Sequence, residues 1–221
     1  MSTHLLARKT YHPRDGIAPL PGLHLARGRA HEVCGGARRA FALWVAARMQ
    51  GVVLWISPAW DPNQLNPDGV VEFVNPARLL FLRANRAEDL LWACEESLRS
   101  GAVPLVVADL PAPPAMTPVR RLHLAAERGG EGRPAPLALL LTPGKGGAPG
   151  IESRWHLTPD HRSPLPEDPR AVREMAQLPR QWRLTRLRAR TAPLKAWTVA
   201  QAGPDSPLRL SDAPVATGVA T

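Results

Sequence analysis

The chain has 221 residues, a formal net charge of +9, and 44% hydrophobic against 21% charged residues. This length and composition allow one sizeable domain with a hydrophobic core and exclude a wholly disordered chain. The basic balance favours a polyanionic partner such as nucleic acid, although a general enrichment in Arg, Ala, Pro and Gly would produce the same charge.

The sequence also bears on location and metal binding. No run of about eighteen apolar residues occurs, so no transmembrane helix is expected. Prolines and Asp15 interrupt the N-terminal stretch before the apolar segment of a signal peptide could form. Cys34 and Cys94 have no CxxC or Cys/His spacing and are expected to be small core residues, and the histidines have no metal-ligand spacing. We therefore expect a cytoplasmic protein that has no metal site and no membrane contact.

One stretch, GRAHEVCGGARRAFALWVAAR, has the order of a strand, a glycine-rich turn and a helix. The apolar strand Ala30 to Cys34 leads into Gly35 and Gly36, which open directly into an apolar helix, as in a phosphate-binding loop. Such a loop also needs a Lys for the phosphates and a Ser or Thr hydroxyl for Mg²⁺, and neither is present. Arg38 and Arg39 stand there instead, and either could in principle meet a phosphate at the helix N-terminus. We expect a degenerate phosphate loop that binds neither ATP nor Mg²⁺.

Apolar runs and turn residues predict an alternation of strands and helices as far as residue 142. Helices are expected to begin at Asn85 and Thr117, where a capping residue precedes an amphipathic stretch, and the first should end at Gly101. Residues 57–76 contain four prolines and are expected to form a loop. The expected strands are Val52–Ile56, Arg78–Leu82, Val103–Leu110 and Pro136–Thr142. This rhythm indicates an α/β fold with a mainly parallel sheet flanked by helices.

The C-terminal third has a different pattern. Ser153–Thr158 alternates as a half-exposed strand does, and Arg180–Arg190 with Ala196–Gln201 is expected to form an antiparallel hairpin with its turn near Pro193. Within the first strand of this hairpin, the apolar residues shift from even-numbered to odd-numbered positions. They can stay on one face of the sheet only if the strand has one extra residue, which predicts a β-bulge near Thr185.

The hairpin is strongly basic. From its first arginine to its last lysine it carries six basic residues and no acid. Such a run is either a solvated strand face or a surface that tracks nucleic-acid phosphates. The candidates for DNA binding are Arg180, Arg183, Arg186, Arg188 and Lys195.

These features predict one core domain with two extensions. Residues 1–20 are expected to be a flexible basic arm, and 202–221 a disordered tail. The core domain then spans 21–201 and includes a proline-rich linker at 159–179.

The combination of pieces resembles the ImuA family, RecA-like accessory proteins of inducible mutagenesis in bacteria. The resemblance covers about residues 20–200 and is strongest in 75–130, where ARLLFLRANRAEDLLWACEESLRSGA looks very like the family; VVLWISP, SRWHLT and QWRLTRLRAR also match. It implies a RecA-like core of the P-loop NTPase type. It also implies a part in SOS-induced translesion DNA synthesis, with a Y-family polymerase-like protein and an error-prone replicative-type DNA polymerase as partners. RecA and single-stranded DNA are further partners that it suggests.

The resemblance to RecA itself is more distant and concerns Asp109. This residue stands where a RecA-type strand would end in its magnesium-proximal aspartate. If a nucleotide binds, Asp109 would lie near its magnesium ion without binding the ion directly; otherwise it is an acid at a strand end that caps a backbone N–H. The loop after Ile56 offers no Glu to activate water, only Asp61.

We therefore expect a non-enzymatic adaptor with no catalytic residues and no cofactor. One alternative is a divergent, DNA-stimulated ATPase of the RecA type, with Arg38 or Arg39 in place of the lysine and Asp109 serving magnesium. A second alternative is an SOS cell-division inhibitor that acts through protein binding only.

Overall fold

The structure, a computed structural model, describes residues 15–160, 179–190, 192–203 and 206–213. In chain order its elements are β1 (Gly16–Ile17), β2 (Leu25–Ala26), β3 (Ala30–Cys34), α1 (Arg38–Ala47), β4 (Val53–Pro58), α2 (Pro67–Val71), the 3₁₀ helix η1 (Pro76–Arg78), β5 (Leu79–Ala84), α3 (Ala87–Ser100), β6 (Leu105–Asp109), α4 (Met116–Gly129), β7 (Leu137–Thr142), β8 (Ser153–Pro159), β9 (Arg180–Ala189), β10 (Lys195–Gln201) and β11 (Arg209–Asp212). Nine of these described strands form one sheet in the order β11-β10-β9-β8-β3-β7-β6-β4-β5.

The sheet is mostly parallel. The neighbouring strands from β8 through β3, β7, β6 and β4 to β5 all pair in parallel. β9 pairs antiparallel with both β8 and β10, and β11 pairs antiparallel with β10. Every residue of β3, β6 and β7 is buried, as expected for central strands that are covered on both faces. The predicted α/β class, with a mainly parallel sheet and a C-terminal antiparallel hairpin, is therefore confirmed.

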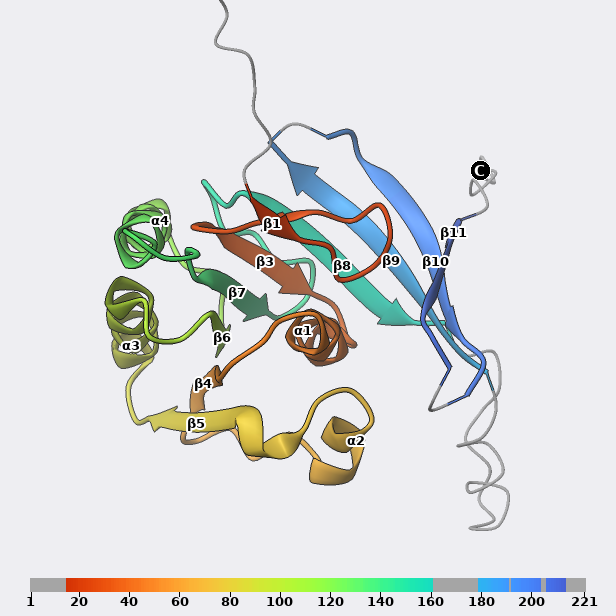
Figure 1. The fold of residues 1–221 in the computed structure, drawn as a ribbon, viewed down its shortest axis with the longest axis horizontal. Helices are drawn as coiled ribbons and strands as arrows, with labels where there is room; N and C mark the ends of the chain where they lie inside the picture. The colour runs from red at the N-terminus through yellow and green to blue at the C-terminus, as the bar shows by residue number, and fades with distance from the viewer. Residues whose placement is uncertain (1–14, 161–178, 191, 204–205, 214–221) are drawn as a thin grey trace, which may run out of the picture.

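Helices cover both faces of the parallel part of the sheet (Figure 1). On one face, Phe41 and Trp44 of α1 pack on Trp155 and Trp182 of the antiparallel part, with ring centroids 6.0 and 5.2 Å apart. On the other face, α3 and α4 pack against each other and against β3 to β7. Among the described residues, no helix has both the length and the apolar character needed to cross a membrane.

The helix starts differ from the predicted ones. The N-cap of α3 is Arg86 rather than Asn85, and α4 is preceded by Ala115 rather than capped by Thr117. Neither start has a side-chain capping hydrogen bond. Tertiary packing of the amphipathic faces therefore fixes these starts, and Gly101 ends α3 in the left-handed conformation, as predicted.

The segment between β4 and β5 is more ordered than a loop. Residues 57–76 were expected to be irregular, but they contain α2 and the start of η1. The side-chain oxygens of Asn66 and Asn75 accept hydrogen bonds from the backbone N–H groups of Asp68 and Ala77. Each Asn-Pro pair is thus a capping residue followed by proline at the first helical position, which sequence analysis read only as a turn signal.

Parts of both predicted extensions belong to the folded domain. Ile17, Leu20 and the strand β1 all lie in the expected N-terminal arm. Both side chains are nevertheless buried, and β1 pairs with β2 of the core domain. In the expected C-terminal tail, β11 pairs with the edge of β10. Ile17 and Leu20 also belong to the main core cluster, and Leu208 and Leu210 pack against it. Local composition does not indicate this packing. Residues 161–178 of the expected linker lie outside the described residues.

Both cysteines are core residues, as the sequence predicts. Cys34 and Cys94 are free thiols and fully buried. Burial raises the pKa of the Cys34 thiol to about 11 and that of Cys94 to about 12. Both thiols are therefore protonated and unreactive near neutral pH.

Candidate functional site

The carboxyl ends of the parallel strands gather the residues predicted for a degenerate phosphate loop. β3 ends at Cys34, β4 at Pro58 and β6 at Asp109, and all three ends lie at one edge of the sheet. This edge is the usual location of ligands in open α/β sheets. The site is therefore built in the expected place.

The connection from strand to helix is too short for a phosphate cradle. Only the residues 35–37 separate Cys34 from Arg38, and Gly35 and Gly36 are adjacent. The phosphate-binding motif G-x-x-x-x-G-K-[ST] has four residues between its two glycines. The turn is therefore too short to wrap around a nucleotide's phosphates, and it also lacks the Lys and the hydroxyl side chain of that motif.

Backbone donors of this turn are engaged inside the protein. The N–H of Gly35 donates to the carbonyl of Gly144 at 3.2 Å, and the N–H of Ala37 donates to the carbonyl of Leu157 at 3.0 Å. Arg38 N–H donates to Gly35 O at 3.3 Å. Gly35 has φ +91°, and a Cβ on it would lie 2.4 Å from Leu157 O. Gly35 is thus required for the close approach to β8, and the N–H groups of Gly35, Ala37 and Arg38 have partners within the protein.

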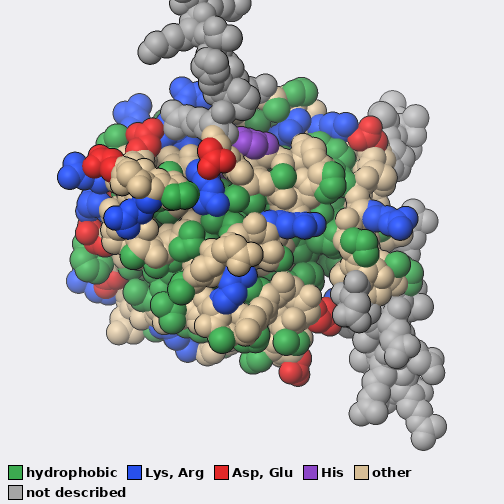
Figure 2. All heavy atoms as spheres, in the orientation of Figure 1, with side chains coloured by type: hydrophobic (Ala, Val, Ile, Leu, Met, Phe, Trp, Pro, Cys, Tyr) green, Lys and Arg blue, Asp and Glu red, His purple; other side chains and the backbone are tan. Residues whose placement is uncertain are grey.

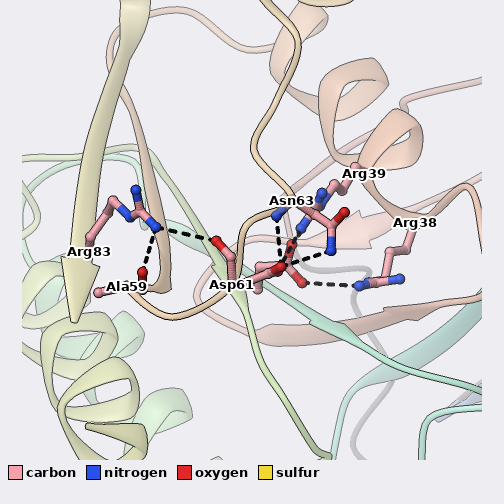
Figure 3. A network of polar contacts seen from close by, with 7 residues as sticks. Arg38, Arg39, Ala59, Asp61, Asn63 and Arg83 are labelled. Atoms are coloured by element: carbon pink, nitrogen blue, oxygen red, sulfur yellow. Dashed lines mark hydrogen bonds and ion pairs between the residues drawn. The ribbon is translucent and has the colours of Figure 1, made fainter. Parts of the chain in front are cut away.

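Arg38 and Arg39 bind an aspartate of the same chain (Figure 3). Arg39 Nε donates to Asp109 Oδ2 at 2.6 Å, and Arg38 Nη2 donates to Asp109 Oδ1 at 3.4 Å. The Asp109 side chain is 3% exposed, whereas the two guanidinium groups are about a quarter exposed. Asp109 was expected to serve magnesium or to cap a backbone N–H, and the structure instead assigns its two oxygens to the two arginines.

Asp61 extends this network on the far side of Arg39. Arg39 Nη2 donates to Asp61 Oδ2 at 3.2 Å, while the backbone and side-chain N–H groups of Asn63 both donate to Asp61 Oδ1 at 2.9 Å. The Asn63 backbone N–H, more than the nearby Arg39, lowers the pKa of Asp61. Arg83 fixes the loop by donating to the carbonyls of Ala59 and Asp61 at 2.7 and 3.2 Å (Figure 3).

This arginine–aspartate network does not fit a magnesium–nucleotide complex. Both oxygens of Asp109 carry hydrogen bonds from cations, and no Ser or Thr hydroxyl of the turn can share a metal with it. Across the described ranges, no three His, Cys, Asp or Glu side chains are grouped so that they could hold a metal ion. The arrangement neutralises the two cations internally and ties α1 to the ends of β4 and β6.

A second buried network lies on β3 and was missed by the sequence analysis, which described this strand only as apolar. Glu32 is fully buried and accepts hydrogen bonds from the Thr142 hydroxyl at 2.7 Å and the Gly147 N–H at 2.8 Å. The Ala148 N–H and the Arg154 guanidinium complete its partners. A charge in the middle of an apolar strand was the signal that could have revealed it, because a buried charge requires such partners.

His31, the other polar residue of this strand, is also buried. Its Nδ1 lies 2.7 Å from the Ser153 hydroxyl, and its Nε2 lies 3.0 Å from the Ala26 carbonyl. A carbonyl only accepts, so Nε2 carries the proton and the hydroxyl donates to Nδ1; the Ser153 oxygen in turn accepts from Trp155 Nε1 at 2.7 Å. Burial lowers the pKa of His31 to about 4. The imidazole is therefore neutral and structural.

The five basic candidates of the hairpin lie on opposite faces of the sheet. β9 has the predicted bulge, but at Leu187: Trp155 pairs with Arg186 and Arg154 with Arg188, which leaves Leu187 between them. Side chains alternate between the faces of a strand, and directly paired residues share a face. Arg186 therefore faces the tryptophan side of the sheet, and Arg188 faces the other side.

The three candidates on the tryptophan face have partners within the protein. Arg186 lies over the rings of Trp155 and Trp197, at 5.6 and 5.2 Å from their centroids, and its Nε donates to the Pro193 carbonyl at 2.8 Å. Burial also lowers the pKa of Arg186. The other two candidates on this face form ion pairs, Arg180 with Glu72 and Lys195 with Asp212 at 2.8 Å.

The other two candidates, Arg183 and Arg188, share the opposite face. Arg183 alternates with the buried Trp182 and Leu184, and Arg188 pairs with Arg154 across the bulge. No described acid forms an ion pair with either arginine. The structure therefore places two of the five predicted DNA contacts on one face of the sheet and the other three on the opposite face.

Comparisons with known proteins assign no family to this chain. The sequence matches no protein-family model and no curated protein. Solved structures similar to it include SulA from Pseudomonas aeruginosa, at 20% sequence identity and a TM-score of 0.41. That alignment covers 52% of this chain and 98% of the SulA chain. A likeness of this size carries no argument about fold or function.

Proposed function

We propose that this chain is a non-enzymatic accessory protein of SOS-induced translesion DNA synthesis, with a RecA-like core whose phosphate loop is degenerate. It would bridge a Y-family polymerase-like protein and an error-prone replicative-type DNA polymerase, with RecA and single-stranded DNA as further contacts. The sequence resemblance to the ImuA family over about residues 20–200 motivates the pathway and the partners.

The observation that supports a non-enzymatic role is the pairing of Arg38 and Arg39 with Asp109. A nucleotide could use these arginines only after they left the carboxylate, and a magnesium ion could use Asp109 only after the same separation. The first change would leave the Asp109 carboxylate, 3% exposed, without its partners, and the second would leave two arginines that are about a quarter exposed without theirs. Breaking a buried ion pair costs up to several kcal/mol. The network thus favours a state in which no nucleotide is bound.

Equilibrium binding of a fluorescent ATP analogue, with and without Mg²⁺ and single-stranded DNA, tests the non-enzymatic part. We expect no saturable binding up to millimolar analogue. Micromolar, Mg²⁺-dependent binding that disappears in Asp109→Ala would overturn this part and support the divergent ATPase.

Binding to purified partner proteins from the same organism tests the adaptor part. We expect the full chain to bind the Y-family polymerase-like protein, with the error-prone polymerase joining the same complex in size-exclusion chromatography. Tight binding to a cell-division protein, without binding to either polymerase, would contradict the adaptor and favour the inhibitor.

A further inference from the structure

One face of the antiparallel part of the sheet has no helix on it among the described residues. α1 packs on the tryptophan face, and α3 and α4 pack on β3 to β7. Figure 1 shows α3 and α4 on the far side of the molecule from β9, β10 and β11. We name the remaining surface the open sheet face; its members on β8 to β11 are Arg154, His156, Thr158, Arg183, Thr185, Arg188, Ala196, Thr198, Ala200, Arg209 and Ser211.

The register of the strands places these residues together. Thr158 pairs with Arg183 and His156 with Thr185, and Thr198 pairs with Arg183 on the other side. Directly opposite residues of antiparallel strands share a face and lie about 4.5–5.5 Å apart at their Cβ atoms. All the members are half-exposed or exposed. Polar and basic side chains therefore form one continuous surface.

Apart from the buried Glu32 that binds Arg154, no acid among the described residues accompanies the basic side chains of the open sheet face. Asp212 is the only acid within the described strands β8 to β11, and it lies on the tryptophan face, where it pairs with Lys195. Glu152 precedes β8 and is paired with Arg29, and Asp160 follows β8. Acids thus stand only at the two ends of the face.

Charges elsewhere are mixed. Figure 2 shows acidic side chains interspersed with basic ones on the side of the molecule where α3 and α4 lie. There, Glu95 is held by both Arg99 and Arg121. On the open sheet face, in contrast, Arg183, Arg188 and Arg209 form no ion pair with a described acid. Within the described part of the chain, no acid neutralises the charge of these three arginines.

Among the described residues, no Trp, Tyr or Phe lies on this face, and His156 is its one aromatic ring. Trp155, Trp182 and Trp197 all point to the opposite side, where they are buried in the core that includes α1. Single-stranded nucleic acid is bound largely by stacking its bases on aromatic rings, and the open sheet face offers only the half-exposed His156 imidazole. Arginines and threonine hydroxyls instead suit phosphate oxygens. A duplex presents these at high charge density and needs no stacking platform.

We propose that the open sheet face binds the phosphate backbone of duplex DNA without regard to base sequence, through Arg183, Arg188 and Arg209. The biological role of this duplex binding rests on the proposed function: the accessory protein would hold the duplex part of a template while its partner proteins act. Binding is electrostatic, falls steeply with salt, and favours a duplex over a single strand of equal length.

Fluorescence anisotropy of a labelled 20-base-pair duplex, titrated with the full chain at several salt concentrations, tests the proposal. The test variant is Arg183→Gln with Arg188→Gln. If each arginine neutralises one phosphate, the slope of log K against log salt becomes about 1.8 less negative, and affinity at 0.1 M salt falls about 60-fold. Circular dichroism checks that the variant is folded.

The matched control is Arg180→Gln with Lys195→Gln, which removes the same charge from the same hairpin on the other face. We expect its slope to equal that of the unchanged chain. An equal loss in both variants would assign the binding to net charge and overturn the proposal. So would the absence of any duplex binding, or a preference for the single strand of equal length. These results are independent of polymerase binding, so failure here and failure of the adaptor are distinguishable.

Discussion

The arginine–aspartate network at the strand ends leads to a sharp stability prediction. Asp109→Asn keeps the shape of the side chain and removes its charge at the 3.4 Å contact of Arg38 and the 2.6 Å contact of Arg39. Arg38 then has no anion beside it among the described residues, and Arg39 keeps only Asp61. Removing one partner of a fully buried pair costs about 3–5 kcal/mol, and an exposed pair contributes about 0–1 kcal/mol. Here the carboxylate is 3% exposed and the guanidinium groups about a quarter. We therefore expect a loss of about 2 kcal/mol, which lowers Tm by roughly 4–8 °C.

Urea unfolding of the nucleotide-free chain measures this loss. Asp212→Asn is the control, because Asp212 also pairs with a cation, Lys195 at 2.8 Å, but is 75% exposed; we expect a change within about 0.5 kcal/mol. A double-mutant cycle with Arg39→Gln should give a coupling energy of about 1–2 kcal/mol. If the free energy of unfolding of Asp109→Asn lies within about 0.5 kcal/mol of that of the unchanged chain, the arginine–aspartate contacts do not stabilise this site. A role for Asp109 in binding a metal ion would then regain support.

Three further predictions concern the strand-end turn and the buried polar residues of β3. Gly35→Ala should destabilise by roughly 1–3 kcal/mol in thermal unfolding, because its φ is +91° and a Cβ would lie 2.4 Å from a backbone oxygen. Gly36→Ala, whose Cβ would have its nearest contact at 3.7 Å, should change little, and equal losses would contradict the close approach to β8. Glu32→Gln should cost about 3 kcal/mol in urea unfolding because it leaves Arg154 without its carboxylate, and a neutral result would show that the amide satisfies the same donors. The pKa of His31 is lowered from 6.5 to about 4, so the unfolded chain binds a proton that the folded chain refuses. Stability from this group is complete above pH 6.5 and is lost as the pH falls toward 4, by roughly 3 kcal/mol. The same pH dependence in His31→Gln would show that another group causes it.

The main elements of the fold could be predicted because their signals are local. Continuous apolar runs marked β4, β6 and β7, since a strand covered on both faces has no polar side. Gly101 marked the end of α3 because only glycine readily takes the left-handed conformation. Helix starts were less predictable. The N-cap positions of α3 and α4 are Arg86 and Ala115, because packing fixes where these helices begin. The helix starts predicted from nearby capping residues were therefore wrong by one or two positions.

The membership of the candidate site could also be predicted, but its chemistry could not. Strand order at a parallel sheet's carboxyl edge brings Arg38, Arg39 and Asp109 together, and the sequence marks each of them. That the two arginines neutralise the aspartate depends on side-chain contacts between residues some 70 positions apart. A degenerate motif shows which groups are missing and does not show which groups replace them.

The sequence by itself determined the fold class, the strand–turn–helix connection and the basic hairpin, because hydrophobic period and turn chemistry act within a few residues. Only the tertiary structure decided which face each hairpin arginine occupies. The extra residue of β9 is Leu187 rather than one near Thr185, so Arg186 keeps the alternation of Trp182 and Leu184 and faces the tryptophans. Arg188, which follows the extra residue, is thereby moved to the open side with Arg183. The side-chain period of a strand is two, and a single inserted position therefore moves every later side chain to the other face of the sheet.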